Sequence, residues 1–279
     1  MTGIRRAVVW GLAALVWAPA LALGQAAGPS VPDLTVEQME AFLLTAEIQS
    51  MRRIGEGTTG AQIATLSDGQ LTHDAQVQAI DESRASIELG GRLVLNFVDS
   101  YRYNVAAYRL ARFLGIENVP VSVVRRVQRD PAAVTWWLDD VAMRERDRLE
   151  QRAGGEASVF LSQQIQRMYV FDALIWNWDR NRGNMLWSSD WTLWMIDHTR
   201  AFRFDEELRT PQELQRVERS LLAALRGLTA DVVAGAVGDT LTEREIAALL
   251  VRRDLIVAHY DARITGRGEA AVLYDLTRP

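Results

Sequence analysis

The chain has 279 residues, 48% of them hydrophobic and 24% charged, which is an ordinary composition for a folded protein with one large core or two lobes. Its formal net charge of -5 argues against a nucleic-acid-binding protein, because such proteins usually carry a basic surface. The sequence contains no cysteine, and all 31 basic residues are arginine, which excludes disulfides, cysteine nucleophiles and catalytic or phosphate-binding lysines.

The first 27 residues have the pattern of an export signal. Arg5 and Arg6 precede an apolar run over residues 7–23, and small residues suited to a signal peptidase follow. We predict a signal peptide over residues 1–27, cleaved after about residue 22 to 27, and a linker over 28–34. The mature protein is then expected to be periplasmic or secreted, without a stable membrane span. An uncleaved signal anchor is the alternative, which the shortness of the apolar run disfavours.

Residues 35–138 are predicted to form a β-rich lobe. A capping box predicts a short helix that begins after Thr35, and a loop with three glycines follows it. His73 is predicted to be a surface residue in a turn. Apolar and β-branched patterns predict a strand meander, one helix and two further strands. In chain order these elements cover residues 61–97, 105–114, 119–124 and 134–138.

Residues 139–279 are predicted to form a mainly helical lobe, after a hinge near residues 137–140. Helical spacing from Ser158 predicts a long helix that leads to a polar loop, and a β-hairpin is expected after the loop. Three more helices are predicted, and the first and the third have a capping pattern at their start. The hairpin and these three helices cover residues 187–196, 210–228, 229–237 and 242 onward.

The polar loop has the sequence N-W-D-R-N-R-G-N over residues 177–184, and the hairpin after it ends in M-I-D-H. Asp179, Asn184 and Asp197 thus have the order and spacing in which kinase-fold phosphotransferases carry a catalytic base and two metal ligands. Phosphoryl transfer needs a carboxylate to orient the attacking hydroxyl and hard oxygen ligands to hold Mg²⁺. We therefore predict Asp179 as the base, and Asn184 and Asp197 as ligands of Mg²⁺ or Mn²⁺.

Two further expectations concern the surroundings of this loop. Arg180 and Arg182 flank Asp179 and are expected to favour its charged form. His198 is predicted to be a hydrogen-bonded structural imidazole, because three histidines without cysteine make a structural zinc site improbable. The plain alternative is that the Asp and Asn residues of the loop only shape a turn.

The glycines at positions 55, 57 and 60 suit a loop that covers phosphates with its backbone N–H groups. We predict that Gly55, Gly57 and Gly60 contribute to a nucleotide site. Glycines between strands more often form plain turns, so this expectation depends on the order of elements around them. A β-rich lobe followed by a hinge and a helical lobe is the order of a two-lobed protein kinase, and we predict an α+β protein with that fold.

Residues 168–202 resemble the core of the bacterial phosphatidylinositol 3-/4-kinase-like clan, which also includes the four-jointed and secretory-pathway kinases. The shared pattern is F-D-x-L-I-x-N-x-D-R-N-x-G-N-x-L, followed by L-W-x-I-D-H-x-R-A-F. A softer match, I-G-x-G-x-T and S-Y-x-Y-x-V-A-A-Y-R-L, lies in the first half of the chain. The resemblance implies a protein-kinase-like fold, ATP as the nucleotide, Asp179 as base, and Asn184 and Asp197 as metal ligands.

The chain departs from this family at two positions. Gln78 stands where the family has a basic residue on the third strand, and Asn104 stands where it has a helix glutamate. That charged pair positions the α- and β-phosphates in kinases, although the neutral residues can still hydrogen-bond to each other within the nucleotide site. Losing both charges together is coherent, because a lone buried charge is costly. The sequence leaves open which arginine replaces the missing cation, and the candidates are Arg84, Arg92 and Arg200.

Three functions are therefore compatible with the sequence. The first is an exported kinase-like phosphotransferase that uses ATP and a divalent metal, with an unknown acceptor that is a protein, a lipid or a small molecule. The second is a pseudokinase that binds or scaffolds, since Gln78 and Asn104 replace the charged pair. The third is a tryptophan-rich periplasmic protein that binds glycans, although Trp187, Trp191 and Trp194 are expected to pack in the core.

Overall fold

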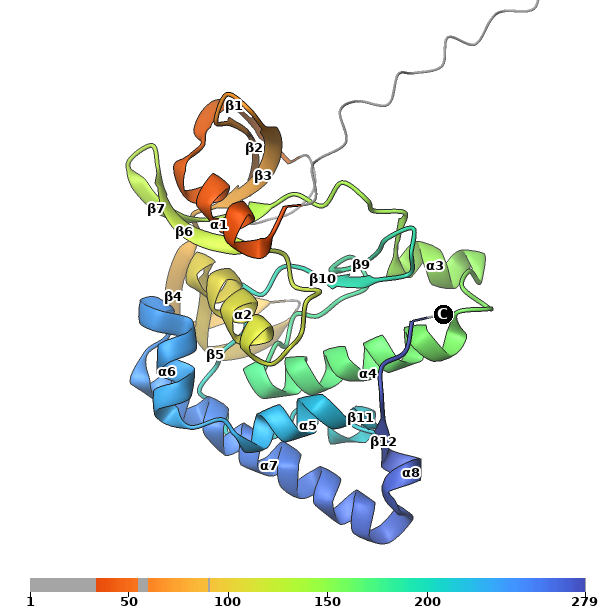
Figure 1. Ribbon diagram of the computed structural model, residues 1–279. Helices are drawn as coiled ribbons and strands as arrows, with labels where there is room; N and C mark the ends of the chain where they lie inside the picture. The colour runs from red at the N-terminus through yellow and green to blue at the C-terminus, as the bar shows by residue number, and fades with distance from the viewer. Residues whose placement is uncertain (1–33, 55–59, 90, 279) are drawn as a thin grey trace, which may run out of the picture. The chain divides into compact units, whose positions relative to one another are not determined.

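The computed structural model describes residues 34–54, 60–89 and 91–278, and these belong to one compact unit. The predicted signal peptide, almost all of the predicted linker, and Gly55 and Gly57 lie outside the described residues. The first part of the described chain is rich in β-strands and the second is mainly helical (Figure 1). The α+β architecture predicted from the sequence is therefore confirmed.

The β-rich part contains a five-stranded antiparallel sheet with strand order β1-β2-β3-β7-β6. Helix α2 contacts strands β6 and β7 of this sheet and also helix α6, so it lies between the sheet and the helical part (Figure 1). The elements are α1 (Val36–Thr45), β1 (Glu47–Arg53), β2 (Gln62–Ser67), β3 (Thr72–Gln78), β4 (Asp81–Leu89), β5 (Arg92–Ser100), α2 (Tyr101–Phe113), β6 (Ser122–Val127) and β7 (Asp130–Trp136).

Local signals start both helices of this part. Thr35 caps α1 through the predicted capping box, in which its hydroxyl accepts from the Gln38 N–H and the Gln38 side chain accepts from the Thr35 N–H. Ser100 caps α2 by accepting a hydrogen bond from the Arg102 N–H. Because α2 begins directly after β5, the end of that strand and the start of the helix form one rigid corner.

The predicted meander is wrong in one respect, because β4 and β5 form a separate two-stranded hairpin. Residues 81–86 of β4 are all exposed, so this strand has no apolar face to bury inside a larger sheet. The base of the hairpin is fixed by two backbone hydrogen bonds, from the Tyr101 N–H to Ile80 O and from the Ser100 N–H to Thr199 O. The second bond joins β5 to the segment that follows β10.

The helical part is built around α4 and α7, which pack against each other. The hairpin predicted after the polar loop is confirmed as strands β9 and β10, and Trp187 within it is fully buried, as expected for a core tryptophan. The elements are β8 (Met143–Arg144), α3 (Glu145–Gln151), α4 (Ser158–Ile175), β9 (Met185–Trp187), β10 (Leu193–Met195), η1 (Pro211–Glu213), β11 (Val217–Glu218), α5 (Arg219–Arg226), α6 (Ala230–Val237), η2 (Gly238–Thr240), α7 (Glu243–Arg267), α8 (Glu269–Val272) and β12 (Leu273–Tyr274).

The helix predicted over residues 210–228 is wrong in its first half. That half consists of the short 3-10 turn η1 and the strand β11, and only α5 is α-helical. The backbone N–H groups of Gln215 and Arg216 donate to the Gln166 side chain instead of to helical carbonyls. Val217 then pairs with Leu273 in a parallel ladder, so tertiary partners replace the local helix.

Among the described residues, no single helix has the length and apolar character needed to cross a membrane. One bent pair of helical segments, Arg219–Arg226 and Ala230–Thr240, meets those criteria jointly.

Candidate functional site

The polar loop begins where α4 ends, at Trp176, whose backbone is left-handed (φ 50°). The buried Asn177 side chain donates to Asp172 Oδ1 at 3.0 Å and accepts from the Asp179 N–H at 3.3 Å. It therefore connects the last turn of α4 to the backbone of Asp179. This contact places Asp179, whose side chain is 35% exposed, on a fixed element and still within reach of a ligand.

Arg180 pairs with Asp172 rather than with Asp179, so its expected support of the charged Asp179 does not come from a direct contact. Its guanidinium contacts both carboxylate oxygens of Asp172, at 2.8 and 3.0 Å. It also donates to the carbonyls of Asn184 (2.9 Å) and Ile196 (2.8 Å). Arg180 thus joins α4, the polar loop and the end of β10, and its donors are used for structure. Arg182 is exposed and, among the described residues, makes no hydrogen bond to Asp179.

His198 has the structural role expected from the sequence. Its Nε2 accepts from Arg180 Nη2 at 2.9 Å, and its side chain is almost completely buried. Burial, together with the positive charge of Arg180, holds the pKa of His198 well below its ordinary value. A neutral imidazole is the form that accepts this hydrogen bond.

Asn184 and Asp197 are brought close to each other by one backbone contact. The Ile196 N–H donates to Asn184 O at 3.2 Å, so the residue before Asp197 is tied to Asn184. Asp197 itself has a left-handed backbone (φ 57°), and its Oδ1 accepts from the Thr199 hydroxyl at 3.2 Å. A non-glycine residue in this conformation is uncommon and clusters at functional sites.

Arg200 is the cation that contacts the predicted base. Its Nη1 donates to Asp179 Oδ2 at 2.9 Å, and its Nε donates to Asp99 Oδ2 at 2.8 Å. The guanidinium also lies against the rings of Phe97 and Trp178, with 5.6 and 6.0 Å to the ring centroids. Asp99 was not predicted as a site residue. The sequence signal that could have identified Asp99 is the two-residue period of β5, which places Asp99 on the same buried face as Phe97.

Three acidic side chains, those of Asp99, Asp179 and Asp197, act on the single positive charge of Arg200. Burial raises the pKa of Asp197, and the negative charges of Asp179 and Asp99 raise it further, against the hydrogen bond from Thr199. Burial lowers the pKa of Arg200, but the hydrogen bond and charge of Asp99, with the charges of Asp179 and Asp197, raise it overall. Two carboxylates, those of Asp99 and Asp179, therefore contact one guanidinium, and Asp197 adds a third negative charge nearby. Among the described residues, no hydrogen bond reaches the buried Oδ1 of Asp99.

This charge balance fits a divalent cation. Carboxylate and amide oxygens are hard donors of the kind that Mg²⁺ and Mn²⁺ take, and a divalent ion would offset the two excess negative charges. Within the described residues, no group of three His, Cys, Asp or Glu side chains is placed to hold a metal by itself. A cation here would therefore need Asn184 and oxygens from a bound ligand besides Asp197.

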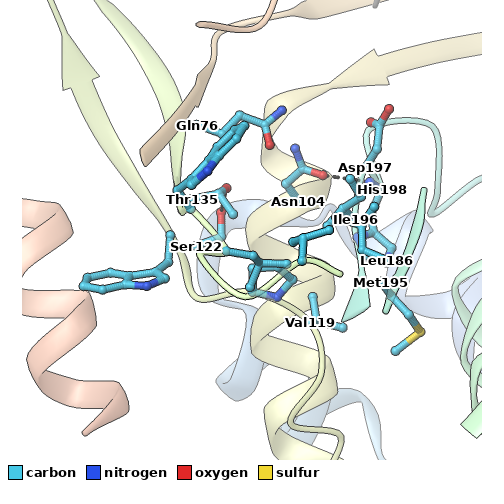
Figure 2. Close-up of a pocket in the computed structure, with 15 residues that line it drawn as sticks. Gln76, Asn104, Val119, Ser122, Thr135, Leu186, Met195, Ile196, Asp197 and His198 are labelled. Carbon is cyan, nitrogen blue, oxygen red and sulfur yellow. Dashed lines mark hydrogen bonds between the residues drawn. The ribbon is translucent and has the colours of Figure 1, made fainter. Parts of the chain in front are cut away.

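A pocket opens beside these residues, between β3, β6 and β7 on one side and the end of β10 on the other. It encloses about 590 Å³ of space, including the part that is open to solvent. Figure 2 shows Gln76, Ser122 and Thr135 across from Ile196 and Asp197. Most of the remaining lining is apolar and comprises Val119, Pro120, Trp136, Trp137, Leu138, Val141, Leu186 and Met195.

Asn104 and Gln78 form the predicted neutral pair. The Asn104 side chain donates to Gln78 Oε1 at 2.9 Å. Its own oxygen accepts from the His198 N–H at 2.8 Å (Figure 2). Asn104 lines the pocket, whereas Gln78 is buried against Asn104 and does not line it. Gly60 is exposed before β2, with φ 68°, and the positions of Gly55 and Gly57 are not described.

His73 is not a surface turn residue, contrary to the prediction. It lies in the middle strand β3, where His73, Ala75 and Val77 alternate on the buried face. Its ring stacks on Trp136 with centroids 3.8 Å apart, and its Nε2 is 2.8 Å from Asp139 Oδ2. The two-residue period of the strand, rather than the polarity of histidine, determines this burial.

No protein-family model matches the sequence, and no curated protein matches it. Solved structures do match. Fam20 of hydra, solved with a sugar, has a TM-score of 0.66 at 15% identity, over 86% of this chain and 92% of that one. The chain has the protein-kinase-like fold. The Golgi casein kinase is similar, with a TM-score of 0.63 at 15% identity, over 86% of this chain and 79% of that one. The structure of the Golgi casein kinase with Mn and ADP bound has a TM-score of 0.62.

At 15% identity these likenesses concern the fold alone. The fold predicted from the order of elements is confirmed, and its structural neighbours include Fam20 of hydra and the Golgi casein kinase. The narrower resemblance to the phosphatidylinositol 3-/4-kinase-like clan stays a prediction, as do the lobe boundaries at residues 138 and 139.

Proposed function

We propose that the protein is an exported kinase-like phosphotransferase that uses ATP and a divalent metal ion, Mg²⁺ or Mn²⁺. The observation that carries this proposal is the group formed by Asp99, Asp179, Asp197 and Arg200, beside the open pocket of a kinase-like fold. A purely structural cluster has no need of an excess of carboxylates, because each uncompensated buried charge costs stability. The acceptor hydroxyl belongs to a protein, a lipid or a small molecule.

The pocket suits the nucleoside part of ATP. Its apolar lining favours a flat base, and its polar groups, Ser122, Thr135 and Asn104, lie where they can orient it. The Golgi casein kinase, which shares the fold, has been solved with Mn and ADP bound. A nucleotide in the pocket would extend its phosphates toward Asp197, which lines the pocket on the side of the acid cluster.

Asn184 and Asp197 would hold the metal ion. When bound, the ion supplies positive charge that offsets the charge of the phosphates. The left-handed backbone of Asp197 and the Arg180 contacts to Asn184 and Ile196 fix these two residues before any ligand arrives. Such pre-organisation reduces the cost of positioning at the moment of reaction.

Asp179 would act as the base. Arg200 holds one of its oxygens, Oδ2, and among the described residues no hydrogen bond reaches the other oxygen. That oxygen can accept the proton of an acceptor hydroxyl. As the proton moves to Asp179, the acceptor oxygen bonds to the terminal phosphorus and the bond between that phosphorus and the ADP oxygen breaks. The proton then passes from Asp179 to solvent, and charge balances on both sides.

Binding of ATP by the purified protein tests the proposal directly. ATP at about a hundred times its dissociation constant, with Mg²⁺ or Mn²⁺, should stabilise the protein by roughly 2.7 kcal/mol. For a domain of this size, that raises the melting temperature by about 5–10 °C. Thermal-shift measurements with ATP alone, metal alone and both together separate the contributions. A folded protein that shows no shift with metal and ATP together contradicts the proposal.

The second candidate is a pseudokinase that binds nucleotide without transferring phosphate. The neutral Gln78–Asn104 hydrogen bond favours it, because these two residues carry no charge at the positions where kinases have the charged pair that places the α- and β-phosphates. Scarcity of ATP outside the cytoplasm favours it too. The first candidate transfers phosphate without that charged pair. The second candidate does not transfer phosphate, and the loss of the pair is the reason.

Restoring the charged pair distinguishes the two candidates. In the double variant Gln78→Lys with Asn104→Glu, the glutamate keeps an acceptor for the His198 N–H and pairs with the lysine. On the proposed function we expect phosphate release from ATP to change by less than about tenfold, because the site already has its own cation. A gain of activity from none would favour the pseudokinase. The single variant Gln78→Lys is the matched control, and its lone buried charge should lower the melting temperature.

A further inference from the structure

Among the described residues, one cation that contacts the acid cluster keeps hydrogen-bond donors that no contact of the fold uses. The guanidinium of Arg180 donates its hydrogen bonds to Asp172, to two backbone carbonyls and to His198. Arg203 is bound to Asp205, to backbone carbonyls of β5 and to the ring of Trp176. Arg84 is more than half exposed and pairs with Glu82 on its own strand. The side chain of Arg92 lies outside those described.

Arg200 differs from these arginines in what it contacts. Its two hydrogen bonds go to carboxylates of the acid cluster, from Nε to Asp99 and from Nη1 to Asp179. No described residue accepts a hydrogen bond from its Nη2, and the side chain is 19% exposed. A guanidinium has five N–H donors in a planar fork, so one edge of Arg200 remains available to a ligand.

The position of that free edge is set by rigid contacts. Asp99 is 2% exposed at the end of β5, and the rings of Phe97 and Trp178 lie against the guanidinium. The contact with Asp179 places the guanidinium next to the proposed base. A phosphoryl group that is attacked by a hydroxyl bound to Asp179 must pass within reach of Arg200. Planar guanidinium groups match phosphate oxygens in two-point hydrogen bonds.

We propose that Arg200 binds the terminal phosphate of the nucleotide, and so supplies the positive charge for which this chain has no strand lysine. This inference rests on the proposed function. It makes Arg200 a catalytic residue that acts from the segment after Asp197. The Gln78–Asn104 hydrogen bond and the bond from the His198 N–H to Asn104 join β3, α2 and the His198 backbone. The charge excess of the acid cluster keeps Arg200 in position when no nucleotide is bound.

The test compares three ligands in the full protein with Mg²⁺, namely a non-hydrolysable ATP analogue, ADP and adenosine. In Arg200→Gln, the affinity for the ATP analogue should fall about 10- to 100-fold, the affinity for ADP by less than about threefold, and that for adenosine not at all. Isothermal titration calorimetry measures all three. The matched control is Arg84→Gln, which removes one charge from the β4–β5 hairpin and should leave all three affinities unchanged.

The outcomes separate this inference from the proposed function. Equal losses for all three ligands, or no loss for the ATP analogue, would overturn the role of Arg200 and leave the proposed function standing. If the unaltered protein binds none of the three, the proposed function itself fails. The double variant Asp99→Asn with Arg200→Gln removes the acid that would be left unpaired, and it should show the same selective loss if Arg200→Gln alone folds poorly.

Discussion

Replacing Asp179 by asparagine should reduce phosphoryl transfer at least about 100-fold while leaving the affinity for ATP within a few-fold of its original value. Asparagine keeps the shape of the side chain and can still accept from Arg200, but it cannot take the proton of an acceptor hydroxyl. Release of labelled phosphate from ATP to water or to the protein itself measures transfer without knowledge of the acceptor. Calorimetry measures ATP binding on the same sample.

Asp205→Asn is the matched control for that experiment. Asp205 lies on the same segment as Arg200, but its carboxylate pairs with Arg203 outside the acid cluster. This variant should retain transfer within a few-fold. An Asp179→Asn protein that transfers phosphate at the original rate would show that Asp179 is not the base, and the proposed step would be wrong even if ATP binds.

Replacing Asp197 by asparagine should have two opposite effects. The variant should lose the part of the ATP-induced thermal shift that depends on Mg²⁺ or Mn²⁺, because a carboxylate ligand is lost. Without metal or nucleotide, the variant should be more stable than the original protein by on the order of 1 kcal/mol, or roughly 2–4 °C. The reason is that burial disfavours the ionised Asp197 carboxylate, the negative charges of Asp179 and Asp99 disfavour it further, and asparagine carries no charge.

The pKa shift of Asp197 gives the direction of this second effect. Its pKa is raised in the folded protein, by burial first and then by Asp179 and Asp99, so the folded state binds the proton more tightly than the unfolded chain. The ionised carboxylate therefore lowers stability at neutral pH, and that cost disappears as the pH falls through the folded pKa. Asp254→Asn, at an exposed position of α7, is the control. A destabilised Asp197→Asn protein would contradict the charge-repulsion account.

Features that depend on a few neighbouring residues were predictable from the sequence. The capping box at Thr35 and that at Thr242 both form as expected, because their partners lie three residues away. The polar loop and the hairpin after it also form as expected. Asn184 and Asp197 approach each other because a short antiparallel hairpin returns the chain to its starting point, which brings Asn184 and Ile196 into contact.

Other predictions failed where a distant partner decides the structure. Residues 214–218 follow a helical pattern, but the side chain of Gln166 and the strand β12 offer their backbone groups other partners. Arg180 is next to Asp179 in sequence, yet the end of α4 brings Asp172 closer to its guanidinium. His73 is polar, but its strand lies in the middle of a sheet, so its position in the two-residue period buries it.

The sequence by itself determined that a β-rich part precedes a mainly helical part, that the chain has no lysine, and how Asp179, Asn184 and Asp197 are spaced. These follow from local periodicity, capping and residue identity, which need no knowledge of the rest of the fold. Only the tertiary structure decided which cation stands among these acids. Asp99 and Arg200 are about a hundred residues apart, and they meet because β5 pairs with the segment after β10 through the Ser100–Thr199 hydrogen bond. Charge pairing between distant elements depends on how the chain packs, and no short pattern in the sequence encodes it.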